Sequence, residues 1–317
     1  MFVIRFHIFI TTWGGGRQGC NLYIPDLLLS YKILKNYLNF VTGAELTTRC
    51  QEGNPLLPID TVLLGLSILG GGHYHRVSAI LEGVAIQTAS THLKRLCDAV
   101  NLVLAPLTLH LPTARRLEEN EQYLAEKYHL PGFGYGVDGV FLYFDEKPRG
   151  IPGDRPPQSF FGRKLRYAIN AQVVGGPDGL IYNLDLSSPG SLTDSTTWRC
   201  SDVKPELEQR HPHYLIAGDS GYPKSKTLVT PYTTQEALND DRKRLFNLRH
   251  SGLRTECTEH IFGRWKKRWP FVKYLRCHWD KACRCIYATA VLQNLSIMWD
   301  DEMPDEPDDE DEDEPQV

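Results

Sequence analysis

Apolar side chains in the first part of the chain recur at helical spacing. Residues 22–50 place them three or four positions apart, which predicts an amphipathic helix. Further runs of this kind, separated by glycines and prolines, cover residues 60–69, 76–81, 87–104 and 115–129. A glycine-containing turn at 82–83 joins two of these runs, so helix, turn and second helix outline a helix-turn-helix over 60–105. An ordinary antiparallel helix pair has the same outline.

The pattern becomes strand-like after residue 136. Short apolar or alternating runs, bounded by Gly, Pro or Asp, occupy residues 141–144, 167–174, 180–186 and 214–217. Two more helical runs follow, at 252–268 and 279–296. Because strands precede helices, this part predicts a mixed α/β domain over 131–298, which follows a helical region over 22–130.

The two ends differ from both regions. Residues 1–21 are expected to be disordered or irregular, because Arg5 and His7 interrupt their apolar start and glycines follow it. The tail at 299–317 is strongly acidic and poor in apolar residues, which predicts disorder. No apolar run reaches the ~20 residues that cross a bilayer, so we expect no membrane association.

Charge is unevenly distributed along the chain. The net charge of −4 includes twelve acidic and no basic residues at 300–317, and without them residues 1–299 carry +8. Residues 242–284 alone hold thirteen Lys or Arg and three acidic residues. Such a surface attracts polyanions such as nucleic acids. The alternative is a solvated surface that the acidic tail neutralises.

The eight cysteines are scattered without the spacing of a disulfide framework, as is typical of reduced thiols in the cytosol or nucleus. Cys277, His278, Cys283 and Cys285 are of zinc-ligand types, but they lack the paired C-x₂-C spacing of zinc sites. The sequence therefore favours buried structural cysteines over a zinc site.

Three carboxylates stand at or beside the ends of apolar segments. Asp138 lies in GVDGV, Asp219 follows an apolar run in GDSGY, and Glu259 lies in ECTEHIFGRWKKRW. A carboxylate in an apolar setting is costly unless a cation satisfies it. The three together suggest one shared cation site, and hard divalent ions such as Mg²⁺ prefer oxygen ligands.

These motifs carry a resemblance to a known family. The order GVDG, YAINAQVV, PGSLTDS, GDSGYP with TPY, and ExxFGxxKxRW resembles the DDE superfamily endonucleases. Within that superfamily it is most similar to PIF/Harbinger transposases and Harbinger transposase-derived nucleases, over residues 56–296. The resemblance implies a ribonuclease H-like mixed sheet flanked by helices, preceded by the helical, helix-turn-helix-like region.

The resemblance also implies the chemistry. Asp138, Asp219 and Glu259 match the catalytic triad of the family and would be its metal ligands. Proteins of this kind cleave DNA phosphodiester bonds with Mg²⁺, for which Mn²⁺ is the alternative, and two such ions can act on both sides of the displacement.

Two further carboxylates are candidates for accessory roles. Glu256 lies three residues before Glu259, on the same helical face, and is the alternative ligand. Asp194 in PGSLTDS occupies a recurring family position, and equally suits a turn or a helix cap. Family members often carry Arg four residues before the glutamate, whereas here Thr255 takes that position and Arg254 precedes it, so the local helix register departs from the family pattern.

Basic side chains near these motifs are candidates for contacts with DNA phosphates. They are Arg264, Lys266, Lys267, Arg268, Lys94 and Arg95. The second helix of the expected helix-turn-helix adds polar side chains that suit phosphates or base edges, namely Gln87, Thr88, Ser90, Thr91 and His92. For all of them, a solvated helix face is the alternative.

Two functions fit these features. The first is a metal-dependent DNA endonuclease of the transposase kind. The second is a catalytically inactive, domesticated transposase that binds DNA or acts as a scaffold. The family resemblance adds an expected nuclear location, with the cytoplasm as the second compartment, and a separate Myb-like DNA-binding protein as partner. A homo-oligomer is also compatible with the sequence.

Overall fold

The computed structural model describes residues 58–72, 79–80, 83–151 and 156–299. The predictions for the two ends and for the helix at 22–50 therefore lie outside the described residues, as does most of the short helix at 76–81. Residues 79–80 of that short helix are helical.

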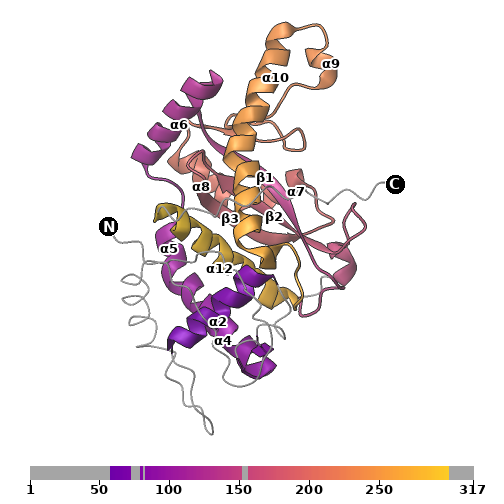
Figure 1. The fold of residues 1–317 in the computed structure, drawn as a ribbon. Coiled ribbons are helices and arrows are strands. Elements are labelled where there is room, and N and C mark those ends of the chain that lie inside the picture. Colours follow the sequence, from indigo (N-terminus) through magenta and orange to yellow (C-terminus); the bar gives the residue numbers. More distant parts are fainter. Residues whose placement is uncertain (1–57, 73–78, 81–82, 152–155, 300–317) are drawn as a thin grey trace, which may run out of the picture.

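A five-stranded mixed sheet forms the centre of the protein (Figure 1). Its strands are β1 (Phe133–Tyr143), β2 (Ala168–Gly175), β3 (Ile181–Pro189), β4 (Leu215–Ala217) and β5 (Leu228–Val229). The spatial order is β3-β2-β1-β4-β5; β1, β2 and β3 are antiparallel, and β4 and β5 run parallel to β1. This is a ribonuclease H-like sheet, so the predicted fold class is confirmed.

Helices precede and follow the sheet. Before it come α2 (Pro58–Gly71), α4 (Ile86–Ala99), a π-helical segment (Val100–Leu104), α5 (Ala105–Thr108) and α6 (Ala114–Tyr128). A 3₁₀ turn (Pro157–Phe160) lies between β1 and β2, α7 (Asp194–Cys200) and α8 (Val203–Arg210) follow β3, and α9 (Thr234–Ala237) follows β5. Last come α10 (Asp241–Arg254), a second π-helical segment (Thr255–Glu259), α11 (His260–Arg268), a 3₁₀ turn (Pro270–Val272) and α12 (Trp279–Met298).

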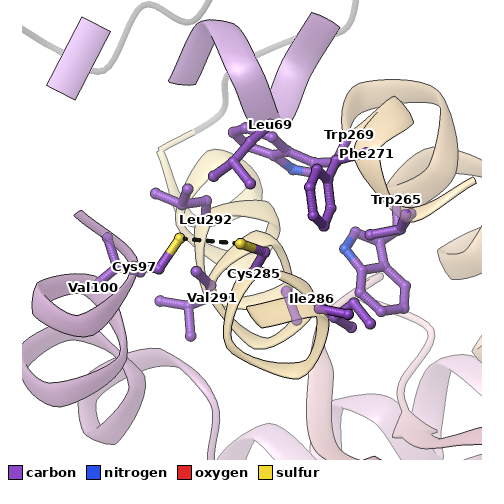
Figure 2. Packing of buried hydrophobic residues seen from close by; sticks show 14 of the residues in the cluster. Leu69, Cys97, Val100, Trp265, Trp269, Phe271, Cys285, Ile286, Val291 and Leu292 are labelled. Carbon is purple, nitrogen blue, oxygen red and sulfur yellow. Dashed lines mark hydrogen bonds between the residues drawn. The ribbon is translucent and has the colours of Figure 1, made fainter. Parts of the chain in front are cut away.

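The helix α12 lies between the sheet and the N-terminal helices (Figure 1). Its buried side chains share one hydrophobic cluster with residues of α2, α4, β1, β2 and α11. Figure 2 shows this cluster, in which the thiols of Cys97 on α4 and Cys285 on α12 lie 3.8 Å apart. The Trp265 indole of α11 is fully buried there and donates a hydrogen bond of 3.1 Å to Thr289. The two regions expected from the sequence therefore contribute to one core.

Within the candidate helix-turn-helix, α2 packs on α4, and Gly83 ahead of α4 has a φ of 66°, which suits glycine. The helix-turn-helix itself stays a prediction, because most of the helix before the turn lies outside the described residues. His92 is wrong as a DNA contact, because it is 6% exposed and its Nδ1 lies 2.7 Å from the Thr61 hydroxyl. Ser90 accepts a hydrogen bond of 2.8 Å from Lys281 of α12. The remaining DNA contacts of α4 stay a prediction.

Among the described residues, none of the helices combines the length and the apolar character that crossing a bilayer requires.

Candidate active site

The ends of two parallel strands bring Asp138 and Asp219 together. Gly136 of β1 pairs with Ala217, the last residue of β4, and each aspartate lies two residues beyond its member of this pair. Because β4 ends there, β1 has an edge that β4 no longer covers at Asp138. Carboxyl ends of parallel strands are a common place for ligand sites in α/β proteins.

Asp138 is largely buried and surrounded by charge. Its Oδ1 accepts a hydrogen bond of 2.8 Å from the Gly139 amide, and its Oδ2 contacts a terminal nitrogen of the Arg254 guanidinium. Burial raises the pKa of Asp138 to about 6, although Arg254 and the Gly139 amide act in the opposite direction. The negative charges of Asp219 and Asp194 raise this pKa further.

Glu259 reaches the same guanidinium from the helical side. Its Oε1 lies 2.5 Å from Nη2 of Arg254, and its Oε2 accepts a hydrogen bond of 3.1 Å from the Thr255 hydroxyl. The Glu259 side chain is 47% exposed, whereas that of Arg254 is 18% exposed. Arg254 thus joins the first and third of the predicted catalytic carboxylates.

A π-helical turn explains how Arg254 reaches Glu259 from five positions away. The segment Thr255–Glu259 is π-helical, and the amide of His260 bonds to the carbonyl of Thr255. In a regular α-helix, residues four apart share a face, but a π turn brings residues five apart together. Arg254 lies one position further from the glutamate than the arginine expected from the sequence resemblance. The extra residue of the π turn compensates for this, so Arg254 still reaches Glu259.

Asp194 lies on the face of β1 to which Gly139 points, which is opposite to the face from which the Asp138 side chain projects. It begins α7, whose N-cap is Thr193, so the alternative of a capping role for Asp194 is wrong. Asn170 of β2 donates a hydrogen bond of 3.0 Å to its Oδ1. A Cβ at Gly139 would lie 2.3 Å from the same oxygen, so glycine is required there for Asp194 to approach the strand.

Glu256 is engaged elsewhere. Its carboxylate receives hydrogen bonds of 2.8 Å from Lys127 and 2.9 Å from Tyr128, both on α6. The Lys127 and Tyr128 hydrogen bonds lower the pKa of Glu256, against the effect of its burial. Of the two glutamates that the sequence left open, only Glu259 shares a partner with Asp138.

Sequence reasoning gave no role to two side chains at this site. Gln172 of β2 donates a hydrogen bond of 3.2 Å to the hydroxyl of Tyr222, and Tyr222 is buried. Burial raises the pKa of Tyr222 strongly, and the charges of Asp194, Asp138 and Asp219 raise it further. The Tyr222 hydroxyl is therefore within electrostatic reach of all three aspartates. The only signal for it was its place in GDSGY.

Comparison with known proteins places this arrangement in a family. The family model for the DDE superfamily endonuclease matches residues 138–294, a span that begins at Asp138 and includes Asp219 and Glu259. The matched domain belongs to this family.

Similar proteins are found in plants and mammals. The Arabidopsis thaliana "Protein ALP1-like" is 24% identical over 273 residues, which is 80% of this chain and 64% of that protein. This chain thus spans slightly less than two thirds of the Arabidopsis relative. The Bos taurus protein named "Putative nuclease HARBI1" is 23% identical over 267 residues, 82% of this chain and 73% of that protein. A crystal structure of a pre-cleavage Mos1 transpososome aligns with 86% of this chain at 12% identity, with a TM-score of 0.19, which is too low to bear on the fold.

The donor set of the matched domain suits a hard divalent cation. Oxygen ligands are available from four carboxylates, namely Asp138, Asp219, Asp194 and Glu259. The negative charges of Asp219 and Asp194 raise the pKa of Asp138, as neighbouring charges do when no cation compensates them. Within the described ranges, no three His, Cys, Asp or Glu side chains lie close enough together to hold a metal ion as they stand. Arg254 occupies the position between Asp138 and Glu259, so metal binding there requires its guanidinium to move.

The basic side chains proposed for phosphate contacts differ in exposure. Arg264 and Lys267 of α11 are exposed, and Lys266 is half-buried. Arg268 is 7% exposed and packs inside the protein, so it is wrong as a phosphate contact. On α4, exposed Lys94 forms an ion pair of 2.6 Å with Asp98, and Arg95 is half-buried.

Proposed function

We propose that this protein is a metal-dependent DNA nuclease of the transposase kind, which hydrolyses phosphodiester bonds. The observation that supports this best is that Asp138 and Asp219 each follow the paired residues Gly136 and Ala217 by two positions. Arg254 in addition joins Glu259 to Asp138. DNA is the substrate that agrees with the family and with the basic segment at 242–284.

The protein's own side chains would have distinct tasks. Asp138, Asp219 and Glu259 would hold two divalent cations, Mg²⁺ or Mn²⁺, and Asp194 is a further carboxylate within electrostatic reach of Asp138. When bound, such cations activate water and stabilise the leaving oxygen. Arg254 keeps Asp138 and Glu259 close together through its two ion pairs. Tyr222 and Gln172 exclude water from the buried side of the aspartates.

A plasmid-nicking assay tests this function. We expect the purified protein to nick supercoiled DNA with Mg²⁺ or Mn²⁺, and Asp138→Asn, Asp219→Asn and Glu259→Gln each to lower the rate at least roughly 100-fold, because each removes a ligand. Glu256→Gln is the matched control, since Glu256 bonds to α6, and it should keep activity within a few-fold of wild type.

The same assay has an expected pH dependence. Because the pKa of Asp138 is raised to about 6, its carboxyl group is protonated below that pH, and the proton then competes with metal. Above that pH the carboxylate is ionised and free to bind metal. The nicking rate should therefore rise as the pH increases through about 6. Nicking that persists in Asp138→Asn, or that never depends on metal, would overturn the proposal.

A second function is favoured by one specific observation. The guanidinium of Arg254 pairs with both Asp138 and Glu259, and an arginine can neutralise two carboxylates without any cation. The protein would then be an inactive DNA-binding or scaffold protein. Salt-sensitive DNA binding that survives Asp219→Asn, with no nicking under any metal, would support this alternative.

We also propose the setting in which the protein works. A nuclear location agrees with a DNA substrate, with the cytoplasm as second compartment. A separate Myb-like protein would supply target recognition, and a homo-oligomer would cut both ends of an element. Fluorescent tagging, co-purification and light scattering test these three proposals in turn.

A further inference from the structure

An aromatic and basic surface begins directly beside Asp194. Gly139, Phe141 and Tyr143 alternate along β1 and lie on the same face of the sheet, and Phe141 pairs with Asn170, whose amide holds Asp194. The rings of Phe141 and Tyr143 are stacked with centroids 6.3 Å apart. Both rings are half-buried, so part of each remains open to solvent.

A cation covers each of these rings. The guanidinium of Arg166 lies 4.2 Å from the centroid of the Tyr143 ring, and that of Arg163 lies 5.9 Å from Phe141. Both arginines and the intervening Lys164 are exposed. Stacked guanidinium planes and aromatic rings are the surfaces on which nucleic-acid bases stack.

The arginines come from a tight turn with an unusual tip. Within it, the amide of Leu165 bonds to the carbonyl of Gly162 at 3.0 Å, and the amide of Gly162 bonds to Arg166 at 3.0 Å. Leu165 has a φ of 56°, where a bulky residue is strained and glycine or asparagine is usual. Its side chain is nevertheless 76% exposed, so neither packing nor backbone geometry accounts for a leucine there. Some DNA-binding proteins insert exposed apolar side chains, leucine included, as wedges between bases.

We propose that Phe141, Tyr143, Arg163, Arg166 and Leu165 form a stacking surface for unpaired nucleotides of the DNA strand that enters the site past Asp194. This inference rests on the proposed function and names the form of its substrate. A duplex hides the faces of its bases, whereas an unpaired end offers them to the rings. The cations favour a polyanion over an apolar peptide.

The length of the surface sets the number of nucleotides. Four steps of β1 separate Gly139 from Tyr143, which is roughly 13 Å at ~3.3 Å per strand residue. Stacked bases are ~3.4 Å apart, so the surface accommodates about four unpaired nucleotides.

Fluorescence anisotropy in EDTA measures this without cleavage. The probes are a blunt duplex and the same duplex with an unpaired extension of roughly four nucleotides at the 5′ or the 3′ end. Wild type should bind one of the extended duplexes at least about 5-fold more tightly than the blunt one, because each stacked base contributes about that factor or more. Leu165→Gly and the double variant Phe141→Ala/Tyr143→Ala should each reduce that preference.

Two variants separate binding from folding. Leu165→Gly relieves a strained φ, so it should not lower thermal stability, and a lost preference cannot then be attributed to unfolding. Tyr123→Ala is the control, since Tyr123 is 42% exposed and has Lys127 5.2 Å from its ring, but lies on α6. It should leave the preference unchanged.

The outcomes distinguish this inference from the proposed function. Equal affinity of wild type for blunt and extended duplexes, or a preference that survives Leu165→Gly and the double variant, overturns the stacking surface even if the protein nicks plasmids. Binding to neither DNA overturns both. A preference that these variants abolish while plasmid nicking is absent supports the surface and leaves the inactive DNA-binding protein as its setting.

Discussion

Arg254 is the side chain that most affects how the site is understood. Its guanidinium contacts Asp138 and Glu259, and these two carboxylates together with Asp219 raise its pKa, which its burial alone would lower. Partly buried charges of this kind are retained only when they are paired. Arg254 therefore provides positive charge between the carboxylates that are proposed to hold divalent cations.

This role predicts how an Arg254→Gln variant responds to metal. Without metal, like charges at Asp138, Asp219 and Glu259 are left unopposed, and we expect a loss of roughly 1–3 kcal/mol in the free energy of unfolding. Saturating Mn²⁺ should raise the melting temperature of the variant more than that of wild type, because metal no longer competes with a guanidinium. Thermal unfolding with and without EDTA measures both effects.

A nearby arginine provides the control for that experiment. Arg242 is exposed in the first turn of the same helix, so Arg242→Gln should match wild type in both conditions. If Arg254→Gln showed the same metal response as wild type, the guanidinium would not share its place with the cations.

The sequence could name the carboxylates but not their connections. Asp138, Asp219 and Glu259 were singled out by motifs that are local in the chain, and their catalytic role remains a prediction. The choice between Glu256 and Glu259 depends on Lys127 and Tyr128, more than a hundred positions away. No local pattern contains that information.

Among helices and strands, the π-helical segment is the element that shapes the site. It places Arg254 and Glu259 on one face, and His260 completes the wide turn. A single π turn is equivalent to one residue inserted into an α-helix, and such turns are frequent at functional sites. In the sequence, the insertion is visible only as an arginine that lies one position away from where it is expected. The π-helical geometry of the backbone could not be predicted from the spacing of apolar side chains.

Deleting Thr255 should therefore be tolerated. The deletion removes one residue from the wide turn, restores the four-residue spacing between Arg254 and Glu259, and leaves the helices on both sides in register. We expect the melting temperature to change by only a few degrees, corresponding to about 1–2 kcal/mol, which includes loss of the Thr255 hydrogen bond to Glu259. Thermal unfolding followed by circular dichroism measures this.

A deletion in the regular part of α10 gives the contrast. Removing Arg249 rotates everything on one side of it by about 100° relative to the other side, because an α-helix has 3.6 residues per turn. That variant should fail to fold. If both deletions were equally damaging, the wide turn would not be a simple insertion.

The strands show where periodicity succeeds and fails. The predicted runs 167–174, 180–186 and 214–217 overlap β2, β3 and β4, because their apolar positions face two layers of helices. The start of β1 at Phe133 was missed, since its first residues include two glycines that resemble a turn. The two-residue β5 is too short to have any period.

For the protein as a unit, the shared core is the decisive feature. Buried Leu93 of α4 and buried Ile286 of α12 belong to the same hydrophobic cluster as Val140 and Val173 of the sheet. The sequence suggested a helical region that ends near residue 130, because the period changes there. Periodicity reports how each element presents its apolar face, but it does not report which other element covers that face.

A substitution in α4 should therefore destabilise the sheet as well. Leu93 is fully buried, so Leu93→Ala should cost roughly 2–5 kcal/mol from lost burial and the cavity that remains. Trp198 and Trp265 lie on the α/β side of the protein, and their fluorescence in a urea titration reports its unfolding. We expect a single transition whose midpoint moves to lower urea in Leu93→Ala.

Leu248→Ala is the control, because Leu248 is 72% exposed, and it should leave the midpoint in place. An unchanged tryptophan transition in Leu93→Ala would instead show that the helices fold independently, and the N-terminal helices would then be free to move relative to the site when DNA binds.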